Sequence, residues 1–320
     1  MIIGRDSTRI STIDDLLDPR LLRVIDGLDL ASRRLMSGTM PGERRAKRRG
    51  SSVEFDDFRE YTDGDDLRHV DWNIAARFDR LVVKLFREEQ DLSLHIMLDL
   101  SPSMCAGVPS KALTAARLSM ALAYLALARN NRVHVSFVGL VKSVTLAPMR
   151  GRTSIHTIAR ELLNVWPSLP YATPGQLIHD DVRHALSAAS PRGVIVLFSD
   201  VLDAVREAQV ALTLMRRLSQ GGEREAFIYQ VLAASELDPT LDAAHGIQGD
   251  VQLIDIERAT PVDATITPLA SRHAAERARA FVDSVSAAAR ANAVHHRVLA
   301  TSDDLAEILL HTLRRDRLLA

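Results

Sequence analysis

The chain has 320 residues, of which 47% are hydrophobic and 25% charged, and its 40 basic and 41 acidic residues leave a formal net charge of −1. This composition supplies enough apolar material for about two domains, or for one large domain with additions, and argues against wholesale disorder. The balanced charge gives no argument for a nucleic-acid or membrane partner, and the single cysteine, Cys105, excludes an intrachain disulfide framework.

The N-terminal residues 1–15 are charged and lack the apolar core of a signal peptide. The fully apolar run at 121–128 is far shorter than the roughly 20 residues that a membrane-spanning helix needs. We therefore expect a cytoplasmic protein without a membrane span.

A helix is expected over residues 11–36, with Asp18 as a plausible N-cap and Pro19 at the first position of a helical turn. Two charge blocks follow: residues 43–49 carry a net charge of +4 and residues 54–66 carry −6. Blocks of opposite sign this close together most simply neutralise each other or form solvated faces. A docking surface for a partner is the main alternative, and nucleic-acid binding is the weakest one.

The segment 50–77 combines aromatic residues with charged ones. The aromatic residues are Phe55, Phe58, Tyr61 and Trp72. The charged residues singled out are Arg59, Asp65, Arg68, Asp71 and Arg77. This mixture indicates a compact lobe in which Arg–Asp pairs are held beside aromatic faces. We favour an internal salt-bridge network over a catalytic role, and we expect a strand at 81–86 to connect the lobe to the next element.

The stretch 92–111 is the most informative part of the chain. Its apolar residues between Leu94 and Leu100 predict a strand that is covered on both faces. Asp99, Ser101 and Ser103 then follow at alternate positions, where the strand ends and before a helix begins. Open α/β sheets bind ligands at the carboxyl ends of their strands, so these oxygens suggest a divalent-metal site. A chance Asp-x-Ser-x-Ser string is the competing explanation.

Strands and helices alternate from residue 92 onward. Strands are expected at 133–138, 143–146, 193–198, 226–233 and 296–300, with a hairpin formed by 251–256 and 264–267. Helices are expected at 111–129, 154–165, 178–189, 204–219, 271–293 and 303–319. This order predicts an α/β fold with a doubly wound, mostly parallel sheet and an N-terminal α+β extension.

Two further residues bear on the proposed metal site. The buried strand 193–198 is followed by Asp200, and a shared site between adjacent strands needs such a second aspartate. Thr173 lies in a turn-rich loop before the helix at 178–189, where an isolated threonine is more often an N-cap than a ligand.

Several kinds of catalytic and cofactor site lack their motifs. The sequence contains neither a P-loop, nor a Gly-x-Gly-x-x-Gly dinucleotide motif, nor a Gly-x-Ser-x-Gly elbow. A phosphotransferase of the aspartyl-phosphate type needs a second carboxylate two residues after Asp99, and Ser101 stands there instead. A single cysteine without paired histidines argues against structural zinc.

Asp99, Ser101, Ser103, Thr173 and Asp200 resemble the metal-ion-dependent adhesion site of von Willebrand factor A domains. The resemblance implies that these residues hold Mg²⁺, with Mn²⁺ or Ca²⁺ as alternatives, and that a carboxylate of a partner completes the coordination shell. Magnesium takes six oxygen ligands and keeps some of its waters. Neutral hydroxyl ligands leave the ion electrophilic, so that it favours an anionic ligand from outside.

A second resemblance covers about residues 37–235. The residues that carry it are Arg48-Arg49-Gly50, Glu54-Phe55, Phe58-Arg59-Glu60-Tyr61, Gly64-Asp65-Asp66, Arg68, Asp71-Trp72, Ala76-Arg77 and Val83-Lys84. They are similar to the signature of the domain-of-unknown-function family numbered fifty-eight, in which it precedes a von Willebrand A-like domain. Such chains are commonly encoded with MoxR-type AAA+ ATPases, which implies a partner or adaptor in a chaperone-like system.

Together these observations predict residues 1–90 as an N-terminal helical segment and signature lobe, and 91–320 as a von Willebrand A-like domain with a hairpin insertion near 240–267. The expected function is that of a non-enzymatic, metal-dependent interaction protein that binds a MoxR-type ATPase, a protein client or both. One alternative is a metal-assisted hydrolase, a phosphatase or nuclease, that uses Arg59, Arg68 or Arg77 to bind anions. The other is a vestigial site in a domain that only packs.

Overall fold

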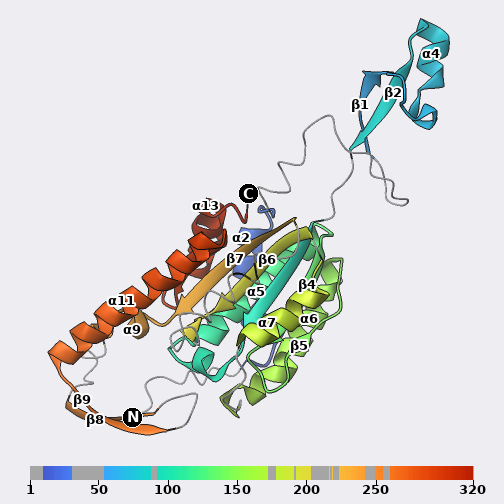
Figure 1. The fold of residues 1–320 in the computed structure, drawn as a ribbon. Coiled ribbons are helices and arrows are strands. Elements are labelled where there is room, and N and C mark those ends of the chain that lie inside the picture. The colour runs from blue at the N-terminus through green and yellow to red at the C-terminus, as the bar shows by residue number, and fades with distance from the viewer. Residues whose placement is uncertain are drawn as a thin grey trace. The chain divides into compact units, whose positions relative to one another are not determined.

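The computed structural model describes residues 10–30, 54–87, 92–171, 178–190, 192–202, 216, 218, 223–241, 249–254 and 260–319. The chain divides into two compact units (Figure 1). Unit 1 is formed by Met1–Gly38 and Leu92–Ala320, and unit 2 by Thr39–Asp91.

Within the described ranges, a six-stranded sheet forms the centre of unit 1, in the order β10-β7-β6-β3-β4-β5. All neighbouring strands pair in parallel except β5, which is antiparallel to β4. The strands are β3 (Ser93–Asp99), β4 (Arg132–Val138), β5 (Val144–Thr145), β6 (Arg192–Ser199), β7 (Glu223–Leu232) and β10 (His295–Ala300). The predicted α/β fold with a mostly parallel sheet is therefore confirmed.

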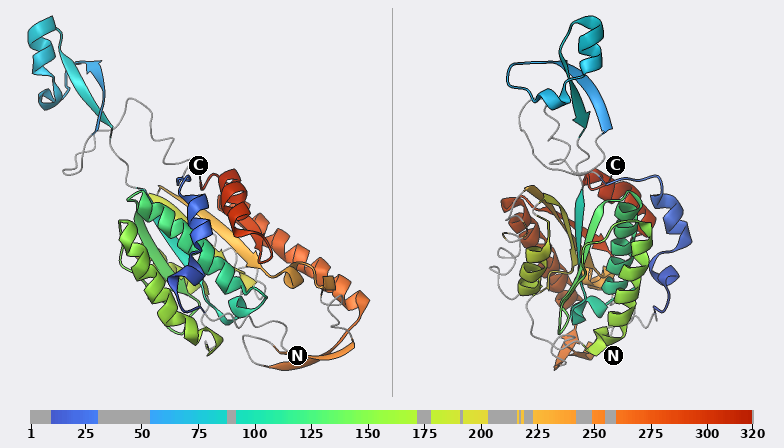
Figure 2. Two further views of the ribbon diagram at one scale, coloured as in Figure 1. Left: turned by 180° about the vertical axis from the view of Figure 1, so that it is seen from behind. Right: turned by 90° about the vertical axis from the view of Figure 1, so that its right-hand side faces the viewer.

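Helices cover both faces of this sheet (Figure 2). They include α5 (Lys111–Ala128), α6 (Ile155–Val165), α7 (Ile178–Ala188) and α11 (Pro268–Ala291). On one face, Ile96 and Leu98 of β3 belong to the same buried cluster as residues of α5 and α6. On the other face, Met97 clusters with residues of α7 and α11. Successive strand residues point to opposite faces, so this arrangement explains why every residue of β3 is buried.

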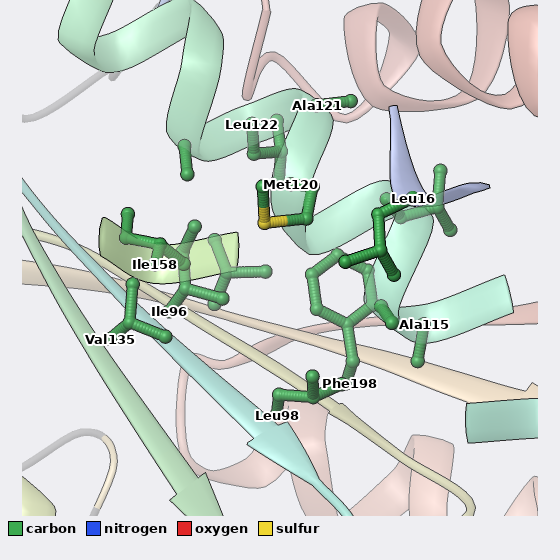
Figure 3. Packing of buried hydrophobic residues seen from close by; sticks show 14 of the residues in the cluster. Leu16, Ile96, Leu98, Ala115, Met120, Ala121, Leu122, Val135, Ile158 and Phe198 are labelled. Carbon is green, nitrogen blue, oxygen red and sulfur yellow. The ribbon is translucent and has the colours of Figure 1, made fainter. Parts of the chain in front are cut away.

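The larger of the two clusters is built around α5. Phe198 of β6, Met120 of α5 and Leu16 from the N-terminal segment are members of it (Figure 3). Helix α5 has the length and apolar composition of a membrane-spanning helix, but 83% of it is buried within the protein. Its burial against the sheet accounts for its composition.

The N-terminal segment forms two short helices, α1 (Ile13–Leu16) and α2 (Pro19–Ile25), within the described residues 10–30. The expected single helix is interrupted because Asp18 caps α2, accepting a hydrogen bond from the Arg20 N–H at 2.7 Å, and because proline at position 19 has no N–H to continue α1. The predicted cap is confirmed. These helices pack on α5, so the expected domain 1–90 is divided between the two units.

Unit 2 is a small hairpin with short helices. Strands β1 (Glu54–Glu60) and β2 (Val82–Arg87) pair antiparallel, with a bulge between Phe55 and Asp57. The connection between them holds the 3₁₀ turn η1 (Leu67–His69) and α4 (Trp72–Phe78). The strand expected at 81–86 corresponds to β2.

The C-terminal part of unit 1 contains an exposed hairpin and a segmented end. After α9 (Ala234–Leu237), strands β8 (Gly249–Ile254) and β9 (Pro261–Ile266) form the expected antiparallel hairpin. The expected closing helix is broken into α12 (Leu305–Glu307), a π-helical turn (Ile308–Thr312) and α13 (Leu313–Arg315). Most of the helix expected at 204–219 falls outside the described residues.

Candidate metal centre

The predicted ligands lie at the carboxyl edge of the sheet, where β3 and β6 end side by side. Asp99 is the last residue of β3, and Asp200 directly follows β6. Each of these two aspartates is 2% exposed. The 3₁₀ turn η2 (Pro102–Cys105) carries the buried Ser103, and the half-buried Ser101 precedes it. The parallel pairing of β3 with β6 thus brings both aspartates to one edge.

Asp99 is fixed by hydrogen bonds to both of its carboxylate oxygens. Its Oδ1 accepts from the Ser101 N–H at 2.9 Å, and its Oδ2 accepts from the Ser199 hydroxyl at 2.5 Å. The Ser101 and Ser103 hydroxyls share a hydrogen bond of 3.1 Å. Three of the predicted ligands therefore lie within one connected turn, with Asp99 held in a single orientation.

Burial and the neighbouring Asp200 both raise the pKa of Asp99, to about 7, although the hydrogen bonds from Ser199 and Ser101 act in the opposite direction. Two carboxylates that share a buried site resist carrying two negative charges. A cation removes this conflict, so the donor set of carboxylate and hydroxyl oxygens fits a hard divalent ion such as Mg²⁺.

Gly139, at the end of β4, allows the backbone to approach Asp99 closely. A Cβ added at this residue would lie 2.6 Å from Asp99 Oδ1 and 2.8 Å from the Ser101 nitrogen, and its φ is +75°. Its N–H donates to Asp181 Oδ2 at 2.9 Å, and Asp181 on α7 is buried. Between the two strands expected at 133–138 and 143–146, the structure thus has a position where no side chain fits.

Asp200 is held by partners that the sequence does not reveal. Its Oδ1 accepts from the Leu202 N–H at 3.1 Å, and its Oδ2 accepts from the Lys111 ammonium at 2.8 Å. The next residue, Val201, has a φ of +57°. A β-branched residue in the left-handed region is strained, and such strain concentrates at functional sites.

Lys111 is the residue that sequence reasoning missed. It is fully buried at the start of α5, and its Nζ also donates to Glu236 Oε1 at 2.5 Å. Burial alone lowers the pKa of Lys111, but the charges of Asp200 and Glu236 outweigh it and raise that pKa. The only sequence signal was a lysine at the end of the stretch 92–111, and its partner Glu236 is 125 residues away.

Thr173, the fifth predicted ligand, lies outside the described residues. Within the described ranges, no three His, Cys, Asp or Glu side chains form a group that could hold a metal ion by themselves. The candidate centre differs from such a cage because its donors are two carboxylates supplemented by serine hydroxyls. The structure therefore brings Asp99, Ser101, Ser103 and Asp200 to one edge of the sheet.

The charged residues of the signature segment form local ion pairs in unit 2. Arg59 pairs with Asp65 at 2.9 Å, and hydrogen bonding from Arg59 lowers the pKa of Asp65 to about 2. Arg68 pairs with the adjacent Asp66 at 2.7 Å.

Asp71 has two roles in the same unit. It caps α4 through the N–H groups of Asn73 and Ile74, and it pairs with Lys84 at 2.9 Å. Trp72 and Arg77 on α4 are exposed. The ion pairs described for Asp65, Asp66 and Asp71 thus all join residues of the lobe.

Comparison with known proteins gives relatives of the same general length. The chain is 27% identical, over 261 residues, to an uncharacterised protein of Mycobacterium bovis and to uncharacterised proteins of two strains of Mycobacterium tuberculosis. These alignments cover 79% of this chain and 76% of each relative. No solved structure matches significantly. The model of a protein family of unknown function, DUF58, matches residues 57–284. The chain therefore belongs to the DUF58 family.

Proposed function

We propose that this protein is a non-enzymatic, metal-dependent interaction module that binds a carboxylate of a protein partner at the carboxyl edge of its sheet. The observation that carries the proposal is the convergence of Asp99, Ser101, Ser103 and Asp200 on that edge. In this proposal the larger unit is a von Willebrand A-like domain and the site is of the adhesion type.

The donor chemistry supports binding rather than catalysis. Asp99, Ser101, Ser103 and Asp200 would hold Mg²⁺, or Mn²⁺ or Ca²⁺, with Thr173 as a proposed further ligand. An ion held partly by neutral hydroxyls keeps a net attraction for an anionic ligand. Among the described residues, the Ser101 and Ser103 hydroxyls hydrogen-bond to each other, and neither accepts or donates a hydrogen bond with a histidine as a Ser–His nucleophile would.

The proposed partner is a MoxR-type AAA+ ATPase, a protein client or both, in the cytoplasm, with this chain acting as an adaptor or co-chaperone. The family resemblance supports this part of the proposal. The hydrolase alternative stays a prediction: Arg59 and Arg68 are paired with carboxylates in unit 2, and Arg77 is exposed. Absence of magnesium-dependent phosphatase and nuclease turnover in the purified protein is the expected result.

The test is a pulldown of the ATPase encoded beside this chain, and of client proteins, in Mg²⁺ and in EDTA. Binding is expected in Mg²⁺ alone and is expected to be lost in Asp99→Ala. Asp263→Ala removes an exposed carboxylate of the β8–β9 hairpin that is not one of the proposed ligands, and it is the matched control. Partner binding that survives both EDTA and Asp99→Ala would disprove the metal-dependent mechanism.

A further inference from the structure

The buried cation at the candidate site is a lysine of the chain itself. Lys111 is fully buried, and it lies between Asp200 Oδ2 at 2.8 Å and Glu236 Oε1 at 2.5 Å. A lysine side chain is almost never fully buried unless it is paired. The ammonium therefore already supplies a positive charge to Asp200, one of the carboxylates proposed to hold the metal ion.

Asp200 is held in place by hydrogen bonds at its backbone and at its carboxylate. The Asp200 backbone carbonyl accepts from Gln230 Nε2 at 3.0 Å, and Asp200 Oδ1 accepts from the Leu202 N–H at 3.1 Å. Lys111, in contrast, ends a flexible four-carbon chain whose ammonium can exchange one acceptor for another. When a second cation approaches Asp200, the ammonium is the group that can move.

Glu236 offers the ammonium a second acceptor. Its Oε2 accepts from the Ala233 N–H at 2.8 Å, which fixes the carboxylate, while its Oε1 faces Lys111. The Glu236 side chain is 30% exposed, so solvent reaches it more readily than it reaches Asp200. The ammonium can thus release Asp200 and still remain paired.

We propose that Lys111 is an internal competitor for the metal: its ammonium occupies Asp200 in the metal-free protein and withdraws to Glu236 when a divalent cation binds. This inference rests on the proposed metal-binding function and adds its regulation. Competition weakens the intrinsic affinity for the ion, so metal binding becomes strongest when a partner carboxylate completes the shell. Lys111 is a positioning residue, since it acts on the ion through Asp200.

The experiment measures Mg²⁺ affinity by titration calorimetry on the full-length chain after dialysis against EDTA. Lys111→Met is expected to bind Mg²⁺ about tenfold or more tightly than the unmodified chain, because the competing charge is gone. Glu236→Gln is expected to bind it several-fold more weakly, because the ammonium then depends wholly on Asp200. Lys142→Met removes an exposed lysine and is the matched control, with no expected change.

The double variant separates competition from a general electrostatic effect. If Glu236 acts by receiving the ammonium, Glu236→Gln changes Mg²⁺ affinity only when Lys111 is present, and its effect disappears in the Lys111→Met background. An equal effect of Glu236→Gln in both backgrounds would overturn the inference. So would a Lys111→Met protein with unchanged or weaker Mg²⁺ affinity.

The remaining outcomes distinguish the inference from the proposed function. Mg²⁺ binding by Lys111→Met but not by the unmodified chain on its own supports the competition, and the pulldown in Mg²⁺ and in EDTA then decides the proposed function separately. Equal binding by both refutes the competition alone, and binding by neither refutes both. Because Lys111→Met also removes a buried ion pair, its melting temperature is measured in parallel; a lower value in EDTA that Mg²⁺ restores is expected.

Discussion

The carboxyl edge of the sheet and the lobe of unit 2 both hold short ion pairs, but they bury them to very different extents. Lys111 and Asp200 have side-chain exposures of 0% and 2%, whereas those of Arg59 and Asp65 are 45% and 20%. Solvent and salt screen the exposed pair, and desolvation makes the buried pair costly to break. Ion pairs of similar composition therefore contribute differently to the free energy of unfolding, and the difference comes from their burial.

The largest expected effect comes from breaking the buried pair. Lys111→Met in EDTA should lower the free energy of unfolding by about 3–5 kcal/mol, because Asp200 is left charged and without its cation. Urea denaturation followed by circular dichroism measures this loss. A loss below about 1 kcal/mol would show that the buried pair is no stronger than a surface pair.

Two glycines with positive φ sharpen the comparison between the regions. Gly139→Ala and Gly64→Ala both incur the cost of a left-handed backbone, roughly 1–2 kcal/mol, but only at Gly139 would the new Cβ meet other atoms. Gly139→Ala should cost about 1–3 kcal/mol more than Gly64→Ala because of this overpacking, and it should weaken Mg²⁺ binding. Equal losses in chemical denaturation would mean that the close approach to Asp99 is unimportant.

The two units should also respond to acid at different pH. Burial, together with the charges of His134 and Arg224, lowers the pKa of His95 to about 3. The unfolded chain takes up this proton below about pH 6.5 and the folded chain does not, so His95 should cost unit 1 up to about 1.4 kcal/mol per pH unit as the pH falls from 6.5 towards 3. The raised pKa of Asp99 acts in the opposite direction between about pH 7 and 3.8, so the contribution of His95 is read from the difference between the natural chain and a His95 variant. Because the pKa of Asp65 is lowered from 3.8, this residue destabilises unit 2 only below about pH 3.8. The loss from Asp65 in unit 2 should therefore come at a lower pH than the loss from His95 in unit 1.

Tryptophan fluorescence can follow the two units separately, because Trp166 lies in unit 1 and Trp72 in unit 2 and the sequence has 2 tryptophans. Trp72→Phe leaves the reporter of unit 1, and Trp166→Phe leaves that of unit 2. His95→Gln should reduce the number of protons that unit 1 takes up on unfolding by about one, which lowers the slope of its unfolding free energy against pH. An unchanged slope would show that His95 does not carry the effect.

The smallest effect is expected in the lobe. Arg59→Met removes an exposed ion pair and should cost less than about 1 kcal/mol. The loss should shrink further in 1 M NaCl, where the Debye length is only about 3 Å. The change is measured through Trp72 in the Trp166→Phe background; a loss as large as that of Lys111→Met would remove the distinction between the two regions.

Most of the fold could be predicted because its signals are local. The continuous apolar runs of β3 and β6 predict covered strands, and Asp18 followed by Pro19 predicts the start of α2. The closing helix was predicted as one element, since helical periodicity does not reveal the π-helical turn at 308–312. Elements defined by nearby residues were thus found, and their interruptions were not.

The candidate site could be predicted only in part. Asp99, Ser101 and Ser103 form a local motif, and Asp200 is predicted because it follows a second buried strand. Lys111 and Glu236 were missed because a lysine at a helix start and a glutamate in a short helix are ordinary in sequence. Only the tertiary fold, which brings Lys111 of α5 to Glu236 of α9, makes them partners, and a single sequence does not contain that information.

The long separation between partners at the site also sets when the site can form. Ser199 lies 100 residues after Asp99, and Glu236 lies 125 residues after Lys111. Contacts between distant residues are slow to form because the chain must first pay the entropy of closing a long loop. During synthesis, the first strand of the site must therefore wait for more than a hundred residues to follow it. A nascent chain that ends before Glu236 would have Lys111 without its second acceptor, so the complete charge arrangement appears only when this part of the polypeptide has been made.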